Sequence, residues 1–148
     1  MSLKIRFFSE EIDFVLEKRV KVRQWITGVI RAENKNPGTI NYIFCSDGYL
    51  LDLNKAYLQH DTLTDIITFP NEDIPTKISG DIYISVERVK ENALKFQQEP
   101  GSELKRVMVH GVLHLLGYHD KTRNEKTLMR SKEDYYLLRY DEYVSRGT

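Results

Sequence analysis

The sequence predicts an α+β fold, in a single domain with a small mixed sheet of about four strands packed with about five helices. The chain has 148 residues, the length of one ordinary domain, and no stretch is long enough to form a linker. Hydrophobic residues make up 41% of the chain, which is enough to build a core. Strand and helix patterns both occur without strict alternation, which favours α+β over a doubly wound sheet. Residues 1–148 are therefore expected to form one domain.

The first half of the chain combines two β-rich segments with two helical ones. Residues 3–8 (LKIRFF) are short and β-compatible. From residue 13 the apolar side chains recur at helical spacing, so 13–35 is predicted to be an amphipathic helix, ended by the Asn-Pro-Gly sequence at 36–38. Residues 39–45 (TINYIFC) alternate and predict a strand, and 47–57 predicts a second helix.

The second half begins with two strands and ends with three helices. The segments 64–69 (TDIITF) and 80–85 (GDIYIS) have strand composition, and the loop between them contains two prolines. Helices are predicted at 86–98, 102–116 and 125–144, and a Pro-Gly pair separates the first two.

The charge balance excludes a globally basic, nucleic-acid-binding domain. The chain has 22 Lys and Arg residues against 22 Asp and Glu residues, and its pI is near 6.9. Two segments are locally basic: 121–132 holds five basic residues and one acidic residue, and 18–23 holds four basic residues. The first is a candidate for RNA contact, whereas the second is expected to be a solvated helix face.

The absence of a recognisable targeting signal and the single cysteine predict a cytoplasmic protein that does not enter a membrane. The N-terminus becomes charged within a few residues and lacks the apolar region of a signal peptide. No run approaches the roughly 18 apolar residues of a membrane span. Cys45 is the only cysteine, so a disulfide within the chain is impossible, and its place at the end of a strand predicts a core residue.

Three of the four histidines lie within residues 110–120. At about 100° per residue, His110 and His114 are one turn apart and about 40° apart around the helix axis. The residues that share their side of the helix are Glu103, Arg106, Val107 and Gly117. The core-facing half is predicted to hold Leu104, Met108, Val109, Val112, Leu115 and Leu116, with Leu113 at its flank. The two histidines therefore lie largely outside the apolar stripe and are expected to be available for chemistry.

Two histidines at this spacing can place two imidazole nitrogens on one metal ion. Gly117 allows a sharp turn after the helix, which brings the following residues back towards the pair. The third ligand is then Asp120 or His119, and Asp120 is favoured because it matches the last ligand of the extended zinc-protease signature. Two imidazoles and a carboxylate leave a coordination position open for water. The alternative is a solvated, histidine-rich surface.

A metallopeptidase is disfavoured by the residue that follows the first histidine. The H-E-x-x-H signature places a glutamate there as the general base, and this chain has Gly111. The ligands of a metal site are therefore present without the base that a peptidase requires.

Three sequence blocks resemble the YbeY family of bacterial endoribonucleases. The first combines residues 54–57 (NKAY) with 64–70 (TDIITFP), the second is 80–85 (GDIYIS), and the third is 110–118 (HGVLHLLGY). Their order and spacing also match those of the family, so the resemblance covers most of the chain. The histidine block is the most specific of the three.

This resemblance implies a Zn²⁺ ion in each chain, held by His110, His114 and Asp120, with His119 as the alternative third ligand. It implies a single-strand-specific endoribonuclease that acts in the maturation of the 3′ end of 16S ribosomal RNA and in ribosome quality control. The implied partners are single-stranded or ribosomal RNA and the small ribosomal subunit, without DNA or a membrane. The alternative function is a non-catalytic, zinc-containing ribosome-assembly factor.

Two departures from the family pattern affect the expected site. The family ends its histidine block in Asp-His, where this chain has His119 and Asp120, so a carboxylate lowers the net positive charge of the metal centre. The family also has an arginine where this chain has Leu58. The cations expected to replace that arginine as phosphate contacts are Arg106, Lys121 and Arg123.

Overall fold

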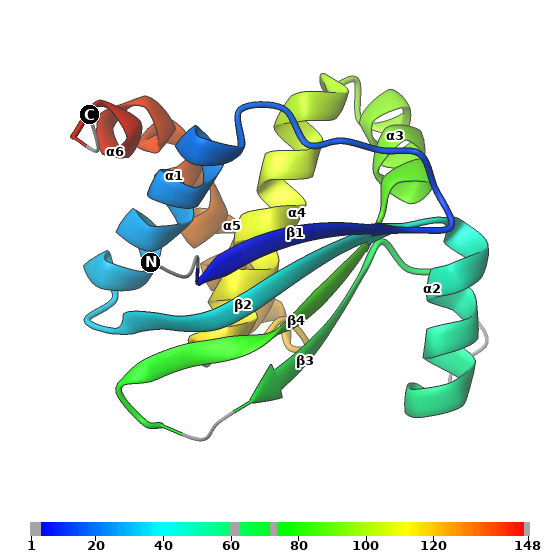
Figure 1. The fold of residues 1–148 in the computed structure, drawn as a ribbon, viewed down its shortest axis with the longest axis horizontal. Helices are drawn as coiled ribbons and strands as arrows, with labels where there is room; N and C mark the ends of the chain where they lie inside the picture. The colour runs from blue at the N-terminus through cyan, green and yellow to red at the C-terminus, as the bar shows by residue number, and fades with distance from the viewer. Residues whose placement is uncertain (1–3, 60–62, 72–73, 147–148) are drawn as a thin grey trace.

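Four strands form one mixed sheet in the order β1-β2-β4-β3 in a computed structural model, which describes residues 4–59, 63–71 and 74–146 (Figure 1). The strands are β1 (Ile5–Glu10), β2 (Asn36–Cys45), β3 (Ile66–Asn71) and β4 (Lys77–Ser85). β2 pairs in parallel with both β1 and β4, and the edge strand β3 pairs antiparallel with β4. The predicted α+β class with a small mixed sheet is thereby confirmed.

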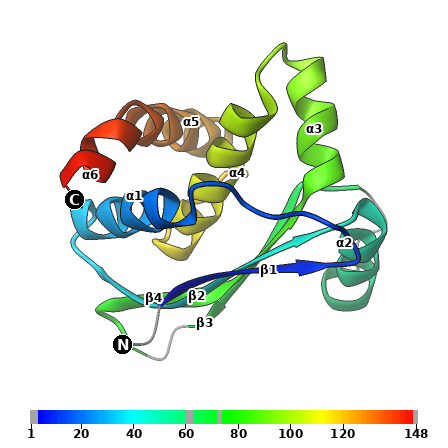
Figure 2. The same ribbon diagram turned by 45° about the horizontal axis from the view of Figure 1, so that its top comes forward.

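Most of the helices cover one face of this sheet (Figure 2). They are α1 (Arg19–Ala32), α3 (Val86–Lys95), α4 (Pro100–Leu115), α5 (Arg123–Leu138) and α6 (Tyr140–Arg146). α2 (Asp47–Leu53) runs directly into a short π-helix, η1 (Asn54–Leu58), and packs Leu50 with Ile67 on the opposite face. Among the described residues, no helix is both long and apolar enough to cross a membrane.

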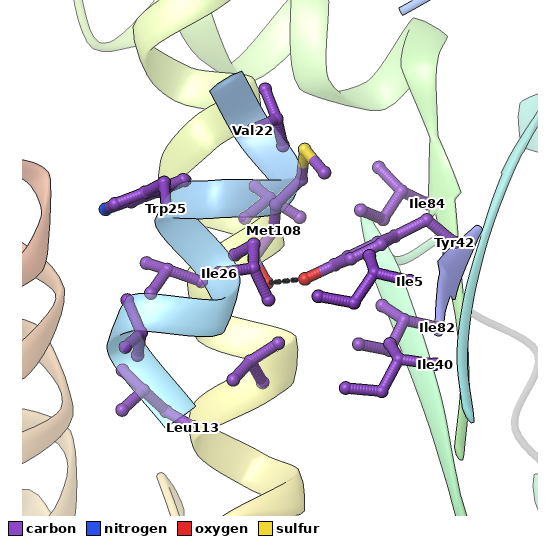
Figure 3. Close-up of a cluster of buried hydrophobic side chains, with 14 of the residues drawn as sticks. Ile5, Val22, Trp25, Ile26, Ile40, Tyr42, Ile82, Ile84, Met108 and Leu113 are labelled. Atoms are coloured by element: carbon purple, nitrogen blue, oxygen red, sulfur yellow. Dashed lines mark hydrogen bonds between the residues drawn. The ribbon is translucent and has the colours of Figure 1, made fainter. Parts of the chain in front are cut away.

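The main core lies between the sheet and helices α1 and α4 (Figure 3). Strand alternation places Ile40, Tyr42, Ile82 and Ile84 on the inner face, and all four are fully buried. From the helices, Met108 and its apolar neighbours on α4 meet this surface. The hydroxyl of Tyr42 donates a hydrogen bond of 2.9 Å to the carbonyl of Met108, so this buried polar atom is satisfied. The core fixes the rotation of α4 about its own axis.

The helix predicted at 13–35 is wrong at its beginning, because α1 starts only at Arg19. The segment before it is extended, and Ile12, Phe14 and Leu16 pack on the core from every second position. Val15, which lies between two of these positions, is 68% exposed. The apolar residues of this segment that pack on the core alternate as in a strand. The sequence predicts a helix here because the residues that follow have helical spacing. The Asn-Pro-Gly sequence at 36–38 opens β2, and the helix ends before it.

The single helix predicted at 125–144 is two helices, α5 and α6, separated at Arg139. The carbonyl of Tyr136 accepts the indole N–H of the fully buried Trp25 at 2.9 Å. α6 then packs along α1, where a Cβ atom at Gly28 would lie 2.7 Å from the ring of Tyr143. Contacts with α1, which a local pattern cannot show, therefore redirect the chain. The bounds of the other predicted elements agree with those of the observed ones to within a few residues. Residue 3, the first of the predicted strand 3–8, lies outside the described ranges.

α4 lies very close to the sheet at Gly111. A Cβ atom at this position would be 2.9 Å from Cγ2 of Ile82 and 3.0 Å from Cδ1 of Ile66, both of which belong to the inner face. A side chain here would force the side chains of Ile82 and Ile66 to shift, or α4 to move away from β3 and β4. The same packing leaves no room for the glutamate that a metallopeptidase carries at this position.

We predict that Gly111→Ala destabilises the protein although alanine favours helix. Overpacking a core costs about 1–3 kcal/mol, and the better helix propensity of alanine returns about 1 kcal/mol. The matched control is Gly101→Ala on the same helix, where nothing lies within 4 Å of the added atom. Urea unfolding should show a lower free energy of unfolding for Gly111→Ala and no loss for Gly101→Ala. Equal stability of the two variants would contradict the close packing.

Candidate metal centre

The end of α4 and the start of α5 position the residues of the site. His110 and His114 lie in the last turns of α4. The helix is closed by Gly117, whose φ of 104° is left-handed, and by the N–H of Tyr118, which donates to the carbonyl of Leu113 at 3.0 Å. α5 begins with a capping box in which the Thr122 hydroxyl and the Glu125 carboxylate each accept a backbone N–H of the other residue. Asp120 therefore lies in a short connection between two fixed helix ends.

Three possible ligand atoms converge at this connection. Nε2 of His114 lies 3.0 Å from Nε2 of His110. Oδ2 of Asp120 lies 3.2 Å from Nε2 of His110 and 3.4 Å from Nε2 of His114. Within the described ranges, these residues are the one group of three or more His, Cys, Asp or Glu side chains that could hold a metal ion. His119 is exposed and is outside the group. The donor set of two nitrogens and one oxygen fits Zn²⁺ with a position left open.

Glu133 on α5 orients the first histidine. Its carboxylate is 7% exposed, and Oε2 lies 2.6 Å from Nδ1 of His110. A carboxylate can only accept, so Nδ1 carries the proton and the lone pair of Nε2 is directed at His114 and Asp120. Histidines that bind metals commonly have such a partner behind them. Glu133 thus completes the arrangement, although it is not itself one of the converging ligands.

Sequence reasoning missed Glu133, and the predicted helix did contain a signal for it. Met129, Glu133 and Tyr136 are the buried residues of α5, at spacings of four and three. An acidic residue inside an otherwise apolar stripe needs a buried partner, because an unpaired carboxylate is costly to bury. Its partners come from α4, which the local pattern could not identify.

Arg106 binds the second carboxylate oxygen of Glu133, the one that does not face His110. Its Nη1 donates to Oε1 of Glu133 at 2.9 Å, and its Nη2 donates to Oδ1 of Asp134 at 2.6 Å. Two carboxylates therefore occupy the guanidinium that the sequence suggested as a phosphate contact. Both ends of the Glu133 carboxylate are engaged, one by Arg106 and one by His110, which fixes its orientation.

The two histidines differ in their electrostatic surroundings. Burial disfavours the charged form of His110, but the hydrogen bond and the charge of Glu133 outweigh this effect, so the pKa of His110 is raised. Burial and the neighbouring His110 lower the pKa of His114. Burial also raises the pKa of Asp65, against the opposing charge of His110. His114 is therefore the more readily deprotonated of the two histidines, as a metal ligand must be.

The cluster faces an open cavity of about 640 Å³ between β3, α4 and the start of α5. Asp65, Arg106, Lys121 and Arg130 are among the polar residues that line it, and Leu58 is among the apolar ones. Leu58 thus occupies the wall of the cavity where the family resemblance implies an arginine. Arg123, the third cation suggested by the sequence, is not among the lining residues, whereas Arg130, which was not singled out, is.

The comparison with protein families decides what this chain is related to. The model of the family described as endoribonuclease YbeY matches residues 5–141. The chain belongs to this family. The membership confirms the resemblance of the three sequence blocks, and it covers both the sheet and the helices that build the cluster.

Individual relatives and a solved structure agree with this assignment. The endoribonuclease YbeY of Flavobacterium psychrophilum is 54% identical over 130 residues, which cover 88% of this chain and 92% of the relative. That of Cytophaga hutchinsonii is 48% identical over 133 residues, with coverages of 90% and 93%. The solution structure of a Thermotoga maritima protein matches with a TM-score of 0.65 at 27% identity, and covers 96% of this chain and 93% of the other. The chain thus spans more than nine tenths of both relatives and shares its fold with the Thermotoga maritima protein.

We predict that the pair of His110 and Glu133 stabilises the metal-free protein more at low pH. The folded pKa of His110 is raised, so its contribution to stability is complete below its unfolded pKa of about 6.5 and is lost as the pH rises through the folded pKa. Urea unfolding in the presence of a chelator should show a larger loss of stability for Glu133→Gln at pH 5.5 to 6 than at pH 9.

The control for this prediction is Asp134→Asn. Asp134 binds the same Arg106 but does not touch His110. The loss of stability in Asp134→Asn should therefore not change with pH as His110 titrates. If Asp134→Asn and Glu133→Gln show the same dependence on pH, the raised pKa of His110 does not come from Glu133.

Proposed function

We propose that this protein is a zinc-dependent, single-strand-specific endoribonuclease that acts in ribosomal RNA maturation, including the 3′ end of 16S RNA, and in ribosome quality control. The observation that carries the proposal is the convergence of His110, His114 and Asp120 on the wall of an open cavity. Membership of the endoribonuclease YbeY family supports the choice of reaction and of RNA as substrate. The small ribosomal subunit is the proposed partner, and the cytoplasm is the proposed location.

His110, His114 and Asp120 would hold the ion, and Glu133 would keep the first of them in place. A zinc ion, when bound, supplies Lewis-acid chemistry that acidifies water and polarises a phosphodiester oxygen. Lys121 and Arg130 present positive charge to the phosphates of a strand lying in the cavity. Asp65 lines the same cavity and has a raised pKa, so its carboxylate accepts a proton more readily than an exposed aspartate does.

A non-catalytic, zinc-containing assembly factor is the second candidate function. It is favoured by Leu58, which supplies no charge, and by Arg106, whose guanidinium is engaged by Glu133 and Asp134. A site in which one expected cation is replaced by Leu58 and another is engaged by carboxylates can hold a metal ion and bind RNA without cutting it. A metallopeptidase is disfavoured, because the packing of Gly111 leaves no room for its general base.

We predict that the purified protein contains about one zinc ion per chain, the occupancy of a site with three protein ligands and an open position. Elemental analysis should show that His110→Ala and Asp120→Ala lose the metal, whereas His119→Ala keeps it. Single-stranded RNA should be cut by the wild type, spared after chelation and cut again when zinc is restored. Denatured protein should not be cleaved.

Each result has a contrary outcome that would change the proposal. Loss of zinc in His119→Ala alone would move the third ligand by one residue. Binding of RNA without cleavage, by a protein that holds zinc, would favour the assembly factor. A wild type that takes up no metal after zinc is added would overturn the catalytic proposal.

We also predict that Leu58→Arg strengthens RNA binding. Leu58 is 44% exposed on the cavity wall, so an arginine there reaches the substrate without displacing core residues. One added phosphate contact should steepen the dependence of log affinity on log salt concentration by about 0.7 for a single strand, and Lys121→Ala should flatten it by about the same amount. Leu58→Met, which has similar size and no charge, is the control. An unchanged salt dependence in Leu58→Arg would place the RNA elsewhere.

A further inference from the structure

A second carboxylate, Glu33, binds the connection between α4 and α5 that carries Asp120. It caps the C-terminal end of α1 and is 14% exposed. Oε1 of Glu33 accepts the hydroxyl of Tyr118 at 2.6 Å, and Oε2 accepts Nζ of Lys132 at 3.2 Å and the hydroxyl of Tyr136. One carboxylate therefore binds three side chains that come from two separate parts of the chain.

The first of these parts is the connection that carries Asp120. Tyr118 follows the left-handed Gly117 and precedes Asp120 by two residues. Its N–H closes α4 through the carbonyl of Leu113, and its hydroxyl is fixed by Glu33. On the other side of Asp120, the N–H of Lys121 donates to the carboxylate of Glu125 at 3.2 Å. The bond from Tyr118 to Glu33 is thus a side-chain anchor on the α4 side of the third ligand, in addition to the packing of the tyrosine ring against the core.

The second part is the segment of α5 that carries Glu133. Lys132 and Tyr136 lie on either side of this residue along the helix. Their bonds to Glu33 fix α5 relative to α1, and so help to fix the carboxylate that orients His110. Burial disfavours the charged form of Glu33, but hydrogen bonds from Tyr118, Tyr136 and Lys132 outweigh this, so its pKa is lowered and it is ionised at neutral pH.

We propose that Glu33 is a positioning residue for the metal centre, which holds Asp120 in reach of the two histidines through the hydroxyl of Tyr118. The proposal rests on the proposed function, because it requires that the cluster bind a metal ion. A ligand that is held in place loses less conformational freedom when it binds, so loosening the connection should weaken metal binding. Glu33 acts through Tyr118 and does not touch the ligands themselves.

The test is a titration of the full-length, metal-free protein with Co²⁺, followed by its visible absorption. We compare the wild type with Tyr118→Phe, which removes one oxygen, and with Glu33→Gln, which removes the charge. The matched control is Tyr140→Phe, because the buried hydroxyl of Tyr140 has no hydrogen-bond partner among the described residues. Circular dichroism and the melting temperature of each metal-free variant report whether the fold is retained.

We expect Tyr118→Phe and Glu33→Gln each to raise the dissociation constant for Co²⁺ about tenfold, the lower end of the effect of residues behind metal ligands. Their cobalt spectra should also differ from that of the wild type, and Tyr140→Phe should match it. The double variant should bind about as weakly as Glu33→Gln alone, because the one bond that Tyr118→Phe removes is already disturbed in Glu33→Gln. A residue that served only the stability of the fold would change the melting temperature and leave the spectrum unchanged.

Two results would overturn the inference, and they differ in what else they affect. If the wild type binds Co²⁺ and Tyr118→Phe binds it equally well with the same spectrum, Glu33 does not position the site and the proposed function stands. If the wild type binds neither Co²⁺ nor Zn²⁺, the proposed function fails as well.

Discussion

The close contact between α4 and the sheet is the constraint on which the rest of this structure depends. The helix has to bury Met108, Val109 and Val112 against the strands and to present His110 and His114 at the edge of the same interface. Gly111 lets the helix approach until its backbone nearly touches Ile82. The rotation of α4 is therefore set by core packing, and the direction of the histidines follows from it.

A buried ion pair network joins the core to the cluster. Glu133 is buried, and a carboxylate in that position is tolerated because Arg106 and His110 satisfy both of its oxygens. Arg106, one of the two arginines that line the cavity, is thereby committed to structure. The positive charge of the cavity wall therefore depends on Lys121 and Arg130, beside the uncharged Leu58.

The part of the site that the sequence could predict is the part that is local in the chain. His110 and His114 are related by the period of one helix, so their proximity follows from spacing. The stop at Gly117 returns the chain towards them, and the register of a known metal signature favours Asp120 over His119. Glu133 reaches His110 through the packing of α5 on α4, and Glu33 reaches Tyr118 from the end of α1. No local pattern specifies either contact. The same division explains the fold: the strands were predicted well, whereas the extended segment before Arg19 and the break at Arg139 depend on contacts with distant residues.

The junction between α4 and α5 also has an electrostatic consequence. The carbonyl groups at the end of α4 give that end a partial negative charge, and the free N–H groups at the start of α5 give the other end a partial positive charge. His110 and His114 lie at the first end and Asp120 lies just before the second. The backbone dipoles thus favour a cation beside the imidazoles and negative charge beside the start of α5. The separation of charge that a metal site needs is present in the helices before any ion arrives.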